Sequence, residues 1–122
     1  MYYTFFQETN KIELVLSDKL TKSELFQITH QLESLSTMYN GINVLIDAGS
    51  LTSYDISTGM DELNMLRHNL NRIERIAIVS DDKFYQFIAK ILGKLTDTEI
   101  RSFSVQEIED GRNWIFPSKL PV

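Results

Sequence analysis

A cluster of hydroxyl and carboxylate side chains follows a short apolar run near the middle of the chain. The run Ile42–Asp47 reads Ile-Asn-Val-Leu-Ile-Asp, and a polar, hydroxyl-rich stretch after it continues to Met60. Such side chains cap a following helix by accepting hydrogen bonds from its free N–H groups, and the same helix terminus attracts anions. Capping alone and capping with a regulatory or binding role both stay open. The candidate binding or regulatory residues are Asp47, Ser53, Tyr54, Asp55, Ser57 and Thr58.

The sequence lacks the usual signatures of catalysis and of metal binding. It contains no Gly-x-Gly-x-x-Gly and no Gly-x-x-x-x-Gly-Lys-Ser/Thr phosphate cradle. It has no cysteine, and its two histidines, His30 and His68, lie far apart and off the apolar helix faces. A zinc site or a catalytic triad needs several such groups together. We therefore expect a protein that is not an enzyme and needs no cofactor and no metal.

Five short segments predict the strands that position the cluster. Ile42–Asp47 has the length and composition of a central strand that is buried on both faces. Arg75–Val79 and Glu99–Phe103 predict two further strands. Tyr2–Phe6 and Lys11–Leu16 are close enough in sequence to form an antiparallel hairpin whose first strand lies at the sheet edge.

The first helix has clear start and stop signals. After a predicted connector at Ser17–Leu20, Thr21 and Glu24 have the spacing of a capping box. Asn40 and Gly41 end the helix, because both residues tolerate the left-handed conformation.

Three more helical patterns follow along the chain. Apolar stripes at residues 60–70 and 84–95 predict two helices. Ser104 and Glu107 repeat the capping-box spacing and open a last helix to about Ile115. Residues 1–122 are thus predicted to form one α/β domain with the element order β-β-α-β-α-β-α-β-α. Its five-stranded sheet is mostly parallel, with an antiparallel N-terminal edge strand.

Composition narrows the class of protein further. A formal net charge of −5 does not supply the basic surface that broad nucleic-acid binding needs. No apolar run is long enough to span a membrane, and we expect no secretory signal at the N-terminus. The absence of cysteine suits a reducing compartment, so we expect a cytoplasmic location.

The element order resembles that of the sulphate transporter and anti-sigma factor antagonist (STAS) domains, close to the small bacterial SpoIIAA-like group. The residues that carry the resemblance are Val44–Asp47, Arg75–Asp81, Glu99–Phe103 and Glu107–Ile115 with Trp114. The resemblance implies a regulatory module that binds a protein partner. This group also resembles CRAL-TRIO domains, which implies the alternative of a small hydrophobic-ligand or lipid-binding domain.

The antagonist members of this family carry Asp-Ser-Ser-Gly-Leu, with a phosphorylated serine, at the start of the second helix. The corresponding stretch here is Asp55-Ile-Ser-Thr-Gly-Met60, which has one extra residue. The resemblance implies that Ser57 or Thr58 takes the place of that serine. A phosphate there would lie in the field of a helix N-terminus and change the surface that a partner contacts.

Alternation along the strands predicts two apolar sheet faces. One face carries Ile12, Leu14, Ile46, Ile76 and Ile78. The other carries Val15, Leu45, Ala77, Val79 and Phe103. Helices of the chain, a ligand or a partner chain must cover this second face, because large bare apolar patches are uncommon on soluble monomers. We therefore predict a homodimer.

Overall fold

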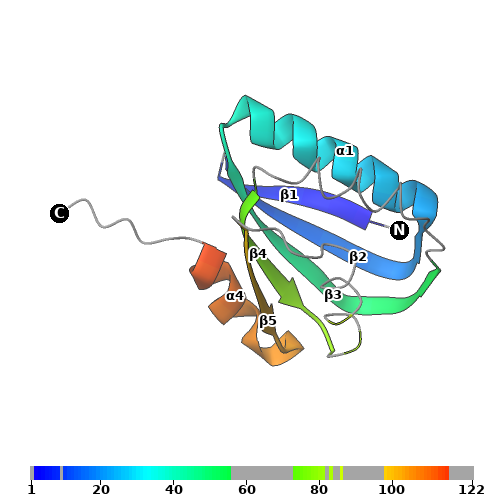
Figure 1. Cartoon of the computed structure of the whole chain (residues 1–122). Helices are drawn as coiled ribbons and strands as arrows, with labels where there is room; N and C mark the ends of the chain where they lie inside the picture. Colours follow the sequence, from blue (N-terminus) through cyan, green and yellow to red (C-terminus); the bar gives the residue numbers. More distant parts are fainter. Residues whose placement is uncertain are drawn as a thin grey trace.

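The sheet has five strands in the order β1-β2-β3-β4-β5 (Figure 1). The computed structural model describes residues 2–8, 10–55, 73–81, 83, 86 and 98–115. The strands are β1 (Tyr2–Glu8), β2 (Lys11–Thr21), β3 (Ile42–Asp55), β4 (Ile73–Val79) and β5 (Glu99–Phe103). β1 is antiparallel to β2, and the other neighbours are parallel. The predicted sheet, with β1 at an edge and β3 in the middle, is confirmed. The helices predicted at residues 60–70 and 84–95 lie outside the described residues.

The first sheet face carries the larger part of the core. Alternate residues of β2, β3 and β4 point to this face and pack against Ile28 and Leu32 of α1 (Lys22–Met38). The buried strand residues of this cluster include Ile12, Leu14, Val44, Ile46, Ile76 and Ile78. Period-two alternation in the sequence therefore assigned Ile12, Leu14, Ile46, Ile76 and Ile78 to the correct face.

The predicted signals at both ends of α1 are confirmed. The Glu24 N–H donates to Thr21 Oγ1 at 3.2 Å, and the Thr21 N–H donates to Glu24 Oε1 at 3.1 Å. At the other end, Asn40 and Gly41 have φ angles of 54° and 112°. His30 is exposed, as its position off the apolar stripe predicted.

The second sheet face is covered by the last helix, on the side opposite α1 (Figure 1). A short 3₁₀ helix η1 (Val105–Glu107) leads into α4 (Ile108–Ile115), close to the predicted bounds. A Cβ at Gly111 would lie 3.2 Å from Leu45 Cδ1 and 3.3 Å from Phe103 Cδ2, so only glycine lets the helix approach this closely without moving its neighbours. The cluster beneath α4 consists of Leu45, Ala77, Val79, Phe103 and Ile115.

Because α4 covers the second face, that face no longer gives a reason to expect a homodimer. The prediction rested on an apolar second face in need of a cover, and α4 covers that face over β3, β4 and β5. The homodimer stays a prediction, and a contact between two copies needs another surface.

Two boundaries predicted from the sequence are wrong. Ser17–Leu20, expected as a connector, is the continuation of β2. The central strand, expected to end at Asp47, continues as β3 to Asp55. The two extensions pair with each other, from Ser17 opposite Ser50 to Thr21 opposite Asp55. Each polar segment looks like a loop by itself, and each is extended because the other supplies its backbone partners.

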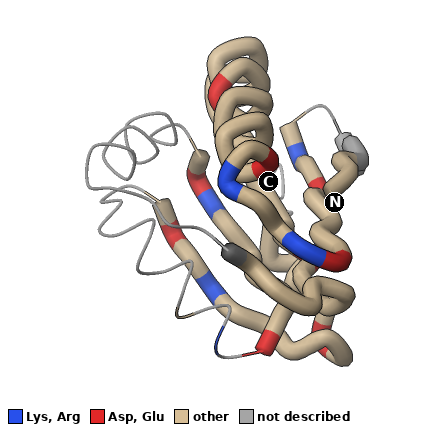
Figure 2. The backbone as a smooth tube through the Cα atoms, turned by 90° about the vertical axis from the view of Figure 1, so that its right-hand side faces the viewer, with Lys and Arg blue, Asp and Glu red and all other residues tan. Residues whose placement is uncertain are grey.

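Charged residues of both signs are spread over the described backbone (Figure 2). In this view, Lys and Arg positions lie among Asp and Glu positions along the described backbone. Among the described residues, no helix has the length and apolar composition needed to cross a membrane.

Candidate functional site

The candidate site lies where β3 runs past the end of β4. β4 pairs with β3 as far as Asp47, opposite Val79. Beyond Asp47, the described part of β3 pairs with β2 alone, so the two strands form a parallel ribbon that extends from the sheet. This is the carboxyl edge of the parallel strands, where functional residues of open α/β sheets usually gather.

Two β-bulges shape this ribbon. β3 has one extra residue between Asp47 and Ser50, and another between Leu51 and Ser53, relative to the facing residues of β2. A bulge bends its strand and redirects the following side chains. The bulges therefore determine which residues of the ribbon reach solvent.

Polar side chains hold both bulges in place. The Gly49 N–H donates to Asp47 Oδ1 at 3.0 Å, next to the first bulge. The Thr52 hydroxyl donates to the Asp18 carbonyl at 2.9 Å, next to the second. Asp18 has a φ of 58°, a left-handed conformation that aspartate tolerates better than most residues. Half-buried Asp47 thus has a structural role within the candidate site.

The other predicted site residues have different surroundings. Ser53 is exposed on the ribbon, whereas Tyr54 is half-buried and packs against the core cluster under α1. Asp55 is the last residue of β3. Ser57 and Thr58 lie outside the described residues. The structure therefore brings Asp47, Ser53, Tyr54 and Asp55 onto one strand, whereas the sequence predicted that this strand ends at Asp47.

The exposed apolar side chain of Val105 lies next to Gly49, at the same edge of the sheet as the candidate site. A Cβ built on Gly49 would lie 3.3 Å from Val105 Cγ2, so η1 packs beside the first bulge. Val105 is 55% exposed. The Ser104 N–H donates to Glu107 Oε1 at 2.9 Å, and this bond lowers the pKa of the Glu107 carboxyl. The capping-box spacing was recognised in the sequence, but the position of Val105 beside β3 has no local sequence signal.

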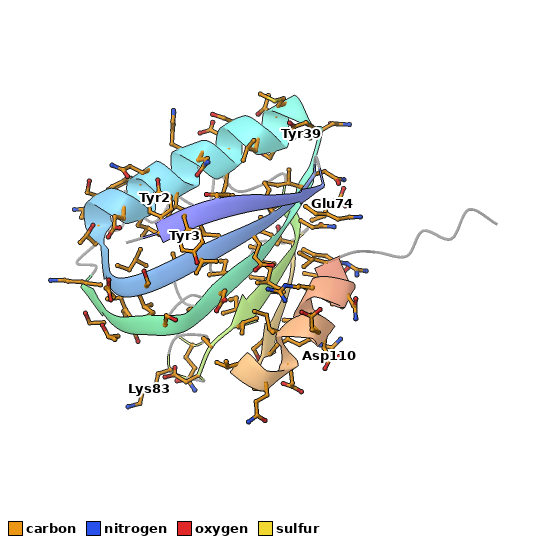
Figure 3. All side chains as sticks on the ribbon, turned by 180° about the vertical axis from the view of Figure 1, so that it is seen from behind. Tyr2, Tyr3, Tyr39, Glu74, Lys83 and Asp110 are labelled. Atoms are coloured by element: carbon orange, nitrogen blue, oxygen red, sulfur yellow. The ribbon has the colours of Figure 1, made fainter. Side chains whose placement is uncertain are left out.

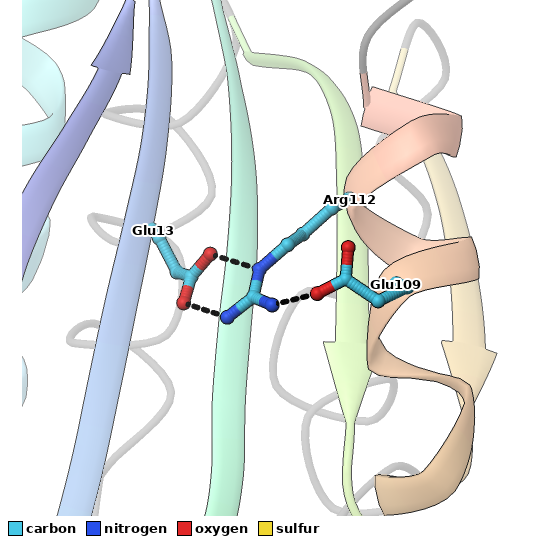
Figure 4. Close-up of polar contacts among 3 residues, drawn as sticks. All are labelled: Glu13, Glu109 and Arg112. Carbon is cyan, nitrogen blue, oxygen red and sulfur yellow. Dashed lines mark hydrogen bonds and ion pairs between the residues drawn. The ribbon is translucent and has the colours of Figure 1, made fainter.

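An ion pair with a buried carboxylate attaches α4 to β2 across β3 (Figure 4). Arg112 Nε donates to Glu13 Oε1 at 2.8 Å, and Nη2 donates to Glu13 Oε2 at 2.9 Å. Arg112 also bonds Glu109 within its own helix. Glu13 is only 2% exposed, so its charge depends on Arg112 for compensation. The hydrogen bond to Glu13 raises the pKa of the Arg112 guanidinium above its ordinary value.

Two further polar contacts hold the last carbonyls of α4. Asn43 Nδ2 donates to the Ile115 carbonyl at 2.8 Å, and Arg75 Nη1 donates to the Trp114 carbonyl at 2.7 Å. The Arg75 guanidinium also lies 5.1 Å from the ring centroid of Trp114. These contacts satisfy two of the carbonyls that have no hydrogen-bond partner within the helix at its C-terminal end. α4 is therefore fixed to β2, β3 and β4 by side chains as well as by its apolar face.

The described residues give no support for a metal centre. No group of three or more histidine, aspartate or glutamate side chains in that part of the chain is placed to hold a metal ion. His68 lies outside it. The polar groups of the candidate site are arranged for hydrogen bonding at a surface.

The strand order, with α1 and α4 on opposite faces of the sheet, is that of an α/β domain with a SpoIIAA-like fold. The chain belongs to the SpoIIAA-like family, which matches residues 11–116. No curated protein sequence matches the chain.

Solved structures share this fold at low sequence identity. The chain is similar to an uncharacterised DUF3478-family protein with a SpoIIAA-like fold from Shewanella loihica PV-4, with 19% identity, 93% of each chain covered and a TM-score of 0.65. It is also similar to the anti-sigma factor antagonist SpoIIAA in its unphosphorylated form, with 10% identity, 90% and 96% covered and a TM-score of 0.58. A third is the Bacillus cell fate determinant SpoIIAA in its phosphorylated form, with 10% identity, 90% and 97% covered and a TM-score of 0.55.

Proposed function

We propose that this chain is a non-enzymatic regulatory module that binds a protein partner through the end of β3 and the segment after it. Membership of the SpoIIAA-like family supports this class of function. One structure with the same fold is named as an anti-sigma factor antagonist. The cytoplasmic location expected from the sequence is part of the same proposal.

The observation that carries the proposal is the ribbon formed by β2 and β3. Ser50, Thr52 and Ser53 are exposed on it, although the backbone of both bulges is held by side-chain hydrogen bonds. A surface with fixed backbone and exposed hydroxyls loses little conformational entropy when a partner binds. Such a surface suits recognition of another protein.

Regulation by phosphorylation is the finer part of this proposal. Ser57 and Thr58 follow Asp55, the last residue of β3, by two and three positions in the sequence. The family resemblance implies that one of them takes the place of the phosphorylated serine of the antagonists. Intact-mass measurement of the protein purified from its host, followed by peptide mapping, would locate a phosphate on either residue. Ser57→Asp should then alter capture of the partner without unfolding the domain.

Ser53→Arg should weaken partner binding at least tenfold, because it places a long charged side chain on the exposed ribbon. The matched control is Ser34→Arg, which makes the same change at an exposed position of α1. Both variants and the wild type would be used as bait in quantitative affinity enrichment from the host. A partner that binds all three equally would contradict the proposed surface.

The hydrophobic-ligand alternative has no specific support in the described residues. The groove between β5 and α4 is lined largely by charged and polar side chains, including Arg101, Glu107 and Asp110. Such a lining does not suit a lipid tail. Native mass spectrometry of the purified protein should therefore give the mass of the chain alone, and a retained hydrophobic molecule would revive the alternative.

A further inference from the structure

The outer edge of β5 is an unused pairing surface in the described structure. β5 is the last strand of the sheet, and its described neighbour is β4. The Ser80 N–H donates to the Phe103 carbonyl at 3.1 Å, so the backbone of Phe103 faces β4. Because backbone groups alternate along a strand, those of Ile100 and Ser102 face outward. An added strand could hydrogen-bond to them.

Side chains leave room for such a strand. Glu99, Arg101 and Ser102 are exposed. An open groove of about 420 Å³ runs beside the strand, between Arg101 and Ser102 on one side and Asp110 and Trp114 of α4 on the other. α4 starts beside the end of β5 and crosses toward the beginnings of β4 and β3, where Arg75 and Asn43 hold its carbonyls. The helix therefore does not block the edge.

We propose that the β5 edge pairs with the β5 edge of a second copy of this chain, antiparallel, around a two-fold axis at Ile100. In this register Glu99 lies opposite Arg101 of the other copy, and Arg101 lies opposite its Glu99. Both pairs occupy non-hydrogen-bonded positions, where facing Cα atoms are about 4.5 Å apart and side chains interact most closely. The contact thus contains two matched ion pairs.

Charge complementarity selects this register from its neighbours. An axis at Arg101 would place the two Arg101 side chains opposite each other, which is unfavourable. Within each copy Glu99 lies 3.9 Å from Arg75 Nε, so the register decides only which charge the second copy supplies. An axis at Ser102 would place Arg101 opposite Phe103 and give Glu99 no opposite charge from the second copy. Only the axis at Ile100 pairs both charges of the strand.

The other edge strand does not offer the same complementarity. β1 reads Tyr-Tyr-Thr-Phe-Phe-Gln-Glu and carries a single charged side chain, so it cannot form matched ion pairs with a second β1. Tyr2 and Thr4 of β1 also donate hydrogen bonds to side chains of α1, to Gln27 at 3.4 Å and to Gln31 at 3.2 Å. Tyr3, labelled in Figure 3, is 49% exposed, but an exposed tyrosine alone names no partner.

Sedimentation velocity of the wild-type protein tests this inference, which does not depend on the proposed function. A contact of one short strand is small, so we expect a dissociation constant on the order of 10–100 µM, measured from about 5 µM to about 500 µM protein. Glu99→Arg and Arg101→Glu should each weaken dimerisation at least tenfold, because each places like charges opposite one another. Far-UV circular dichroism would verify that both variants remain folded.

A mixture of the two variants provides the decisive control. Glu99→Arg has two arginines on the edge and Arg101→Glu has two glutamates, so an equimolar mixture should form a heterodimer as strong as the wild-type dimer. The double variant E99R/R101E should dimerise with itself again. Ser102→Pro should prevent dimerisation by removing an outward N–H, without disturbing the bonds to β4.

Several outcomes would overturn the inference. A wild-type protein that stays monomeric at the highest concentration has no such contact, and the edge would then be free for a strand of another protein. A dimer that the single variants leave unchanged has its contact elsewhere. Failure of the mixture to restore the dimer would exclude the register at Ile100.

Discussion

Arg112→Met should lower the free energy of unfolding by about 3 kcal/mol, because it removes two charge-assisted hydrogen bonds from the buried carboxylate of Glu13. Both oxygens of Glu13 accept from Arg112, and Glu13 is 2% exposed. The arginine side chain itself is 29% exposed, so water limits the loss, and we place it at the lower end of the range for such pairs. Urea denaturation followed by far-UV circular dichroism would measure the effect.

Two controls separate the lost charge from lost packing. Glu109→Gln removes the second carboxylate that bonds Arg112. Because the Glu109 side chain is 73% exposed, this change should lower the free energy of unfolding by less than about 1 kcal/mol. The double variant E13L/R112M removes both buried charges and should recover most of the stability, since apolar pairs often replace buried ion pairs without loss. If Arg112→Met is as stable as the wild type, Glu13 does not depend on this contact.

Leu45→Ala should lower the free energy of unfolding by about 3 kcal/mol, because it opens a cavity between the sheet and α4. Leu45 is fully buried, and its Cδ1 lies against Gly111, where no larger residue of the helix can fill the space. The single tryptophan of the chain, Trp114, lies on α4 with its ring centroid 6.1 Å from that of Phe103. The fluorescence of Trp114 should therefore change in the Leu45→Ala variant, because the packing of α4 on the sheet becomes looser.

Val105→Ala is the matched control for this cavity. Val105 is an apolar residue of the preceding turn but is 55% exposed, so its truncation should cost less than about 0.5 kcal/mol. Equal losses for Leu45→Ala and Val105→Ala would mean that the packing under α4 contributes little to stability.

The fold could be predicted from the sequence because its signals are local. Alternation in β2 separated Ile12 and Leu14 from Glu13 and Val15, and the structure places them on opposite faces. The apolar run ending at Val79 and the spacing of Ser104 and Glu107 located β4 and the start of η1. Periodicity and capping depend on neighbouring residues alone, so one chain is enough to recognise them.

The shape of the candidate site could not be predicted in the same way. The segment Ala48–Asp55 is rich in small and hydroxyl residues, which is typical of a loop. It is a strand because Ser17–Thr21 pairs with it. The sequence of neither segment indicates that the two segments pair. The bulges depend on the difference in length between the two paired segments, which appears only when their register is known.

The contact between Glu13 and Arg112 illustrates the same limit at a longer range. The sequence placed Glu13 on the second face, where an isolated acid is unexpected. Its partner is 99 residues away, on a helix whose position over the sheet is not encoded in any local pattern. An ion pair between residues so far apart in the sequence can be recognised only from the three-dimensional structure.

The strands lie in the sheet in the order in which a ribosome would make them. Each newly synthesised strand can therefore dock on the previous one while synthesis continues. Arg112 is synthesised after all five described strands, so Glu13 must remain hydrated on the open face of a nascent sheet until α4 arrives. A chain that stops before Arg112 would lack the guanidinium that bonds both oxygens of Glu13, and α4 could not close over the sheet in the same way.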